Sequence, residues 1–119
     1  QIKEVLMFNN RINLKGNLTK DPTYKEVNNT TVLNFRVAVN EKTGKGHEET
    51  TFIDIEGWGS HAQYAENVSL SKGDRVIIEG RLRQKSWSDG SGQKRTNYFV
   101  APNNFSKVVT PTGGRNKPE

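Results

Sequence analysis

The chain has 119 residues, with 18 Lys and Arg against 13 Asp and Glu, a net charge of +5 and no Cys. Only 31% of the residues are hydrophobic; these numbers predict one domain with a modest core and exclude disulfide scaffolding and thiolate chemistry. No apolar run approaches the roughly 18 residues of a membrane span and no signal-peptide core is evident, so we expect a soluble, cytoplasmic protein with an acidic partner such as nucleic acid and no contact with a membrane.

Alternation of apolar and polar residues predicts three strands in the first half of the chain, at residues 11–18, 31–39 and 51–59. Pro22 ends the first strand because it cannot continue a ladder, and a polar loop through Asn28 and Asn29 is expected after it. Residues 40–50 are charged and interrupted by Gly, which predicts a mobile loop. The first half therefore contributes three short strands to an all-β fold.

The third predicted strand carries large aromatic side chains on its polar face. Ile53 and Ile55 lie on the strand face that must be buried. Phe52 and Trp58 therefore lie on the opposite face, together with two carboxylates. Exposed aromatics on a sheet either form a binding platform or are covered by a neighbouring subunit. The pattern alone leaves both interpretations open.

A short helix is expected at residues 60–68, opened by an S-x-x-Q capping box, and residues 72–101 then form a long hairpin around a turn at residues 88–92. Val76, Ile78 and Leu82 are predicted to face the core. The opposite parity carries Arg75, Ile77, Glu79, Arg81, Arg83, Lys85 and Trp87. Such a basic hairpin ending in an indole either grips an extended polyanion or is a solvated edge that discourages aggregation.

Five strands with a helix between the third and fourth predict an all-β fold, a five-stranded Greek-key barrel of the OB type with a long hairpin joining its fourth and fifth strands. We expect this barrel to occupy residues 10–108, after an N-terminal extension at residues 1–9. The last segment, residues 109–119, is rich in Thr, Pro, Gly, Asn and Lys and is expected to be a disordered tail.

No catalytic, metal or cofactor site is predicted. Gly44-Lys45-Gly46 lacks the upstream Gly and the following Ser or Thr of a phosphate-binding loop. Asp54 and Glu56 share a strand face, but cross-strand pairing with Arg or Lys accounts for them better than hydrolysis. The two histidines, in a loop and in the first turn of the helix, have no second ligand at metal spacing. We therefore expect a binding protein and not an enzyme.

Three segments resemble the bacterial-type single-stranded DNA-binding protein (SSB) family. They are N-R-I-N-L-K-G-N-L-T-K-D-P at residues 10–22, S-K-G-D-R-V-I-I-E-G-R-L at 71–82 and R-Q-K-S-W-S-D-G-S-G at 83–92. The resemblance covers about residues 10–108. The order G-N-L-x-x-D-P, K-G-x-x-V-x-I-E-G-x-L and x-W-x-D is specific, although each motif alone is weak.

The resemblance implies an OB-fold homo-oligomer, most often a tetramer, that coats single-stranded DNA during replication, recombination and repair without sequence preference. The positions matching the family's DNA-stacking aromatics are Phe52, Trp58 and Trp87, and those matching its phosphate-binding cations are Arg11, Arg83 and Lys85. Strand parity, rather than the resemblance, adds Lys15, Arg36 and Arg81 as further phosphate contacts. Stacking faces combined with a cationic groove are what binding of single strands requires.

The sequence departs from the family in three places. The segment at residues 40–50 is short and lacks a tryptophan, Pro102 is expected to interrupt the last strand, and the chain ends without an acidic tail. The missing tail puts recruitment of replication and repair proteins in doubt and is compatible with truncation or with an organellar, phage or plasmid origin. Two other functions stay open: an RNA-binding OB protein, and an interaction subunit of a replication-restart assembly whose partner covers Phe52 and Trp58.

Overall fold

The structure is a computed structural model that describes residues 9–109. The predicted N-terminal extension and tail lie outside the described residues, except for Asn9 and Val109. In chain order the elements are β1 (Ile12–Leu18), β2 (Thr23–Val27), β3 (Thr30–Lys42), β4 (Glu48–Trp58), α2 (Ser60–Asn67), β5 (Arg75–Ser88) and β6 (Lys94–Lys107).

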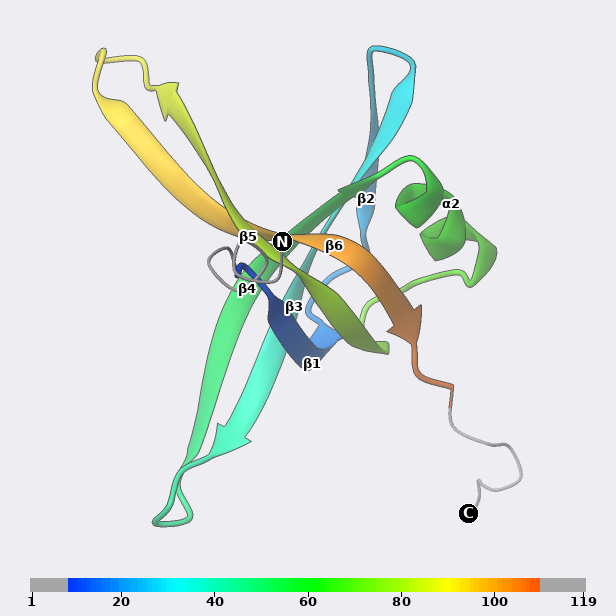
Figure 1. Ribbon diagram of the computed structural model, residues 1–119, viewed down its shortest axis with the longest axis vertical. Helices are drawn as coiled ribbons and strands as arrows, with labels where there is room; N and C mark the ends of the chain where they lie inside the picture. The colour runs from blue at the N-terminus through cyan, green and yellow to red at the C-terminus, as the bar shows by residue number, and fades with distance from the viewer. Residues whose placement is uncertain (1–8, 110–119) are drawn as a thin grey trace, which may run out of the picture.

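Five of the strands close into a barrel. The sheet has the order β1-β5-β6-β4-β3, and β1 also pairs with β3, which joins the two edges. The contact between β4 and β6 is parallel, whereas the other pairs are antiparallel. Figure 1 shows the β2–β3, β3–β4 and β5–β6 hairpins extending away from the barrel as long arms. The predicted all-β barrel, with its helix between the third and fourth barrel strands and its long final hairpin, is confirmed.

The core fills the barrel and the space beneath α2. Its buried residues are Leu18, Leu33, Phe35, Val37, Ile55, Ala62, Ala65, Leu70, Val76, Ile78, Val100 and Phe105. Phe105 packs edge-on against Tyr64 of α2, with ring centroids 5.2 Å apart, and lies 5.7 Å from the ring of Phe35. These contacts tie the helix to β3 and β6, so that α2 covers one end of the barrel.

The polar loop expected between the first two predicted strands contains a strand instead. β2 pairs with β3 from Thr23, opposite Asn34, to Val27, opposite Thr30. Asn28 and Asn29 both have positive φ, 49° and 65°, which is the geometry of a two-residue hairpin turn. All five residues of β2 are exposed. Because it lies outside the barrel and buries no face, it has no hydrophobic alternation to reveal it.

The mobile loop expected at residues 40–50 is mostly strand as well. The β3–β4 ladder continues through Asn40 opposite Thr50 to Lys42 opposite Glu48, and the Thr50 hydroxyl donates to Asn40 Oδ1 at 2.7 Å. Both faces of this arm are exposed, so charged residues suit it and no apolar pattern marks it. The actual turn is confined to residues 43–47.

Pro102 does not end the last strand, contrary to expectation. β6 runs through it to Lys107, and the register shifts so that Gly80 opposes Pro102 whereas Glu79 opposes Asn104. The extra residue in this bulge lets the ladder pass a residue without an N–H. A Cβ atom on Gly80 would lie 2.4 Å from the carbonyl oxygen of Ala101, so the close approach of the two backbones requires glycine there.

Two local expectations at the ends of elements were wrong. The N-cap of α2 is Gly59, without a side-chain cap bond, so the capping box does not form. The Gln63 side chain instead donates to Asn67. Leu82 is 42% exposed rather than buried, because β5 has already left the barrel there. Its backbone N–H and C=O instead bond the side chain of Asn10.

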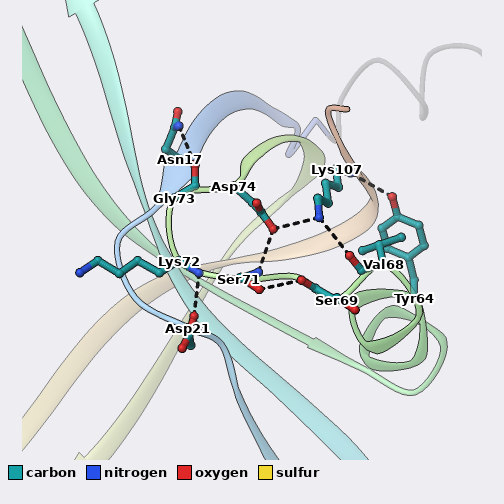
Figure 2. Close-up of polar contacts among 10 residues, drawn as sticks. All are labelled: Asn17, Asp21, Tyr64, Val68, Ser69, Ser71, Lys72, Gly73, Asp74 and Lys107. Carbon is teal, nitrogen blue, oxygen red and sulfur yellow. Dashed lines mark hydrogen bonds and ion pairs between the residues drawn. The ribbon is translucent and has the colours of Figure 1, made fainter. Parts of the chain in front are cut away.

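A polar cluster secures the connection between α2 and β5 to the end of β6 (Figure 2). Lys107 Nζ lies 3.3 Å from Asp74 Oδ2 and donates to the carbonyl of Val68 at 3.0 Å. The Lys107 backbone N–H donates to the Tyr64 hydroxyl. The Asp74 carboxylate also accepts from the N–H of Ser71. One lysine at the strand terminus therefore holds the end of the helix and the start of β5 together.

Candidate nucleic-acid interface

Alternate residues of β3, β4, β5 and β6 form a continuous surface that faces away from the core, here called the outer face. Residues directly opposite each other in a ladder lie on the same side of the sheet. Arg36 opposes Asp54 across β3 and β4, and Lys85 opposes Asn97 across β5 and β6. The parallel pair of Ile55 and Val100, both buried, joins the two halves. The outer face therefore crosses four strands without interruption.

The three aromatic residues singled out in the sequence all lie on this face and are well exposed. Phe52 is 55%, Trp58 40% and Trp87 44% exposed. Phe52 and Trp58 lie on β4, six residues apart, whereas Trp87 lies far along the β5–β6 arm, opposite Arg95. Two of the rings thus share one strand and the third is carried away from the barrel.

A groove of about 450 Å³ occupies the part of the outer face nearest Phe52. Its lining residues come from the β1–β2 connection and from β2 to β6: Thr19, Lys20, Asp21, Thr23, Asn34, Phe35, Arg36, Phe52, Asp54, Glu56, Lys85, Asn97, Tyr98 and Phe99. Its lining includes four aromatic rings, three cations and three carboxylates. The groove therefore offers the two kinds of group that contact a single strand, flat aromatic rings and cations, while its formal charges balance.

A second hollow, of about 390 Å³, lies further along the same face. Trp58 and Arg81 line it together with His61 of α2 and Pro102 of β6, and Arg81 donates to Asn103 Oδ1 at 3.0 Å. The structure thus brings Trp58 and Arg81 together, although they are 23 positions apart in the chain.

The cations of the outer face differ in whether a carboxylate already neutralises them. Arg36 Nε lies 3.0 Å from Asp54 Oδ1, and Lys85 Nζ lies 2.7 Å from Glu56 Oε1. Both pairs join outer-face residues, as the cross-strand interpretation of the two carboxylates predicts. Arg83 forms no ion pair with any residue in the range 9–109. It is therefore better placed than the paired cations to meet a phosphate.

Three of the predicted phosphate contacts line neither hollow: Arg83, Lys15 and Arg11. Lys15 is on β1, opposite Ile77 of β5. Arg11 precedes β1 and lies 3.4 Å from Glu79, as measured between Nε and Oε2. Neither residue lines a hollow with Phe52 or Trp58.

The tip of the β5–β6 arm is held by the Asp89 carboxylate. It accepts hydrogen bonds from the Ser91 hydroxyl and the backbone N–H groups of Ser91 and Gln93, and its second oxygen accepts from Arg95 Nε at 2.9 Å. The Ser91 hydroxyl, followed by the Arg95 guanidinium, lowers the pKa of Asp89 to about 2. Because Arg95 opposes Trp87 in the ladder, this network orders the backbone that carries the indole.

Sequence reasoning missed the aromatic residues of β6. Phe99 opposes Arg83 on the outer face and lines the groove, and the exposed ring of Tyr98 borders the same groove. With Val100 assigned to the core, alternation alone places Phe99 on the outer face, and that signal was available in the sequence.

Within residues 9–109, no cluster of three His, Cys, Asp or Glu side chains could hold a metal ion. In the same range no helix is long and apolar enough to cross a membrane.

Comparison with known proteins identifies the class. The model of the single-strand binding protein family matches residues 9–108, so the chain belongs to this family, whose members are non-enzymatic DNA-binding proteins. The resemblance seen in the sequence motifs is confirmed.

Individual relatives carry the same name. The single-stranded DNA-binding protein of Thermus thermophilus is 37% identical over 87 residues, which cover 72% of this chain and 32% of that protein. Single-stranded DNA-binding protein 1 of Synechocystis is 36% identical over 98 residues, covering 81% of this chain and 80% of that protein. The chain thus spans about a third of the Thermus relative and most of the Synechocystis one.

Among solved structures, a Plasmodium falciparum SSB in complex with single-stranded DNA is similar to this chain. The TM-score is 0.74 at 20% identity, over 86% of this chain and 97% of the other. This likeness shows the fold and confirms that the barrel is of the OB type.

Proposed function

We propose that the protein binds single-stranded DNA along the outer face, without sequence preference and without catalysis, and that it protects exposed strands during replication, recombination and repair. The observation that carries this proposal is the row of exposed aromatic rings, Phe52, Trp58 and Trp87, among cations on one sheet face. Every base presents a π-face, so stacking does not depend on base identity. Family membership and the names of the relatives support the same function.

The architecture favours single strands over duplex DNA. The only helix in residues 9–109 has eight residues, Ser60–Asn67, and no Lys or Arg, so it is poorly suited to reading a major groove. A face with exposed aromatic rings suits a strand whose bases are unpaired. As a DNA-binding protein it would act in the compartment that holds the DNA, which for a bacterial-type protein is the cytoplasm. Base stacking and phosphate contacts are available to DNA and RNA alike, so RNA is the competitor that experiment must address.

The test is a tryptophan fluorescence titration of the chain with poly-dT, poly-rU and a DNA duplex at fixed salt. Stacked indoles are quenched, so we expect strong quenching and tight binding with poly-dT and weak binding to the duplex. Tighter binding of poly-rU than poly-dT would indicate an RNA-binding protein. Failure of every nucleic acid to bind would indicate that a protein partner covers the aromatic rings.

We also propose that the protein assembles as a homotetramer. Ile77 is 50% exposed on β5 beside Lys15 of β1, and burial against a second copy would remove it from water. Light scattering at tens of micromolar protein, the order of magnitude set by typical non-obligate affinities, tests this proposal. A mass of four chains is expected, and a monomer would contradict the proposal.

A further inference from the structure

The Phe99 ring lies on the outer face but is covered by a salt bridge. Phe99 is 7% exposed, and Lys85 Nζ stands over its ring, 5.1 Å from the centroid. The same ammonium group donates to Glu56 Oε1 at 2.7 Å. Phe99 opposes Arg83 in the ladder and lines the groove. Without the Lys85 ammonium group above it, the ring would be open to that groove. An ion-paired ammonium group therefore lies over a buried aromatic ring on the proposed binding face.

The position of Phe99 completes the row of rings. Phe52 and Trp58 are six residues apart on β4, which corresponds to about 20 Å at the usual rise of a strand. Because Ile55 pairs with Val100 in the parallel ladder, Phe99 falls beside Asp54, between the two rings along the strand direction. A strand of DNA that stacks on Phe52 and Trp58 must pass over this covered position.

From this geometry we propose that Phe99 is an additional base-stacking residue, and that the Lys85–Glu56 bridge is a lid over it which opens when DNA binds. The inference rests on the proposed function. A phosphate competes with Glu56 for the Lys85 ammonium, and the base beside that phosphate then reaches the ring. The Lys85 side chain is 51% exposed, so the bridge is screened by water and easily exchanged.

Stacking on one aromatic ring is worth about 5- to 150-fold in affinity, whereas an exposed ion pair is worth at most about fivefold. A base stacked on Phe99 therefore at least offsets the loss of the bridge. It follows that a variant with a weakened lid should bind poly-dT more tightly than the original chain, but only while the Phe99 ring is present.

The experiment is a double-mutant cycle measured with poly-dT at fixed salt. Phe99→Leu keeps an apolar side chain in place and should weaken binding at least fivefold. Glu56→Gln should tighten it about two- to fivefold, and this gain should vanish in the E56Q/F99L double variant. Asp54→Asn is the matched control, because it removes a carboxylate from the same face without uncovering Phe99. Asp54→Asn should change the affinity for poly-dT by the same factor with or without F99L.

A gain from Glu56→Gln that persists undiminished in the double variant would mean that only general repulsion had been relieved, and would overturn the proposal. An F99L variant whose affinity for poly-dT lies within twofold of that of the unaltered chain would also overturn the proposal. Crosslinking of the unaltered chain to a 5-iodouracil-substituted dT oligomer avoids any dependence on variant folding. A crosslink on Phe99 is expected, and crosslinks confined to Phe52, Trp58 and Trp87 would contradict the lid.

The two levels of failure are distinguishable. If the unaltered chain does not bind poly-dT, the proposed function falls and this inference falls with it. If the chain binds poly-dT tightly but without any contribution from Phe99, this inference alone is wrong.

Discussion

Arg36 Nε and Asp54 Oδ1 lie 3.0 Å apart across β3 and β4, whereas Arg83, on the same outer face, has no carboxylate partner among the described residues. This difference predicts unequal roles in phosphate binding. Arg83→Ala should make the slope of log K against log salt less negative by about 0.7, the value for one phosphate contact by a single strand. Arg36→Ala should change the slope by less, because Asp54 already neutralises that charge. Equal changes in the two variants would show that the ion pair does not persist in solution.

The Asp89 network predicts a pH dependence confined to the hairpin tip. The folded pKa, about 2, lies below the ordinary value of 3.8. The stabilising bonds are therefore fully present above pH 3.8 and are lost as the pH falls through about 2. In Asp89→Asn at neutral pH, hydrogen exchange at the Ser91 and Gln93 amides should accelerate. The amide of Gly92, which donates to the Asp89 backbone carbonyl, is the internal control; acceleration there as well would mean that the whole tip had unfolded.

Lys107→Met tests the cluster that connects α2, β5 and β6. The variant removes the hydrogen bond to the Val68 carbonyl and the ion pair with Asp74. We expect the free energy of unfolding to fall by about 1.5–3 kcal/mol, the range for hydrogen bonds to charged groups. Lys94→Met, on the exposed arm, should change it by less than about 0.5 kcal/mol. Urea denaturation of both variants provides the comparison, and equal stability of the two would contradict a structural role for Lys107.

The bulge in β6 predicts that Gly80 tolerates no side chain. Gly80→Ala places a Cβ 2.4 Å from the Ala101 carbonyl oxygen, which forces the two strands apart at the root of the hairpin. The free energy of unfolding should fall by about 1–3 kcal/mol, the usual penalty for overpacking. Gly44→Ala is the control, since no atom lies within 4 Å of its added Cβ. A Gly80→Ala variant as stable as this control would show that the bulge relaxes without cost.

The sequence predicted the barrel because burial imposes a pattern there. Ile53 and Ile55 had to face inward, so Phe52 and Trp58 had to face outward, and the structure places them so. The strand β2 and the β3–β4 arm escaped prediction because no face of theirs is buried, and polar residues form strands there through backbone pairing alone.

The site was less predictable than the barrel because it depends on register. Alternation shows that Lys85 points outward but not that it spans Phe99 to reach Glu56 on another strand. Likewise, no local pattern predicts that Trp58 and Arg81 line one hollow, or that Lys15 of β1 lines neither of the two hollows. Such contacts depend on which strands are neighbours and on the bulge between Glu79 and Gly80.

The most direct test of the outer face as the DNA-binding surface is the affinity of Trp58→Ala for poly-dT as a function of salt. We predict a loss of about 1–3 kcal/mol with an unchanged salt slope, because the ring contributes stacking and no charge. Tyr24→Ala is the matched control. Tyr24 is an exposed aromatic that opposes the buried Leu33, so it lies on the other side of the sheet, and its loss should leave binding intact. If Trp58→Ala bound as tightly as Tyr24→Ala, the outer face would not be the DNA-binding surface.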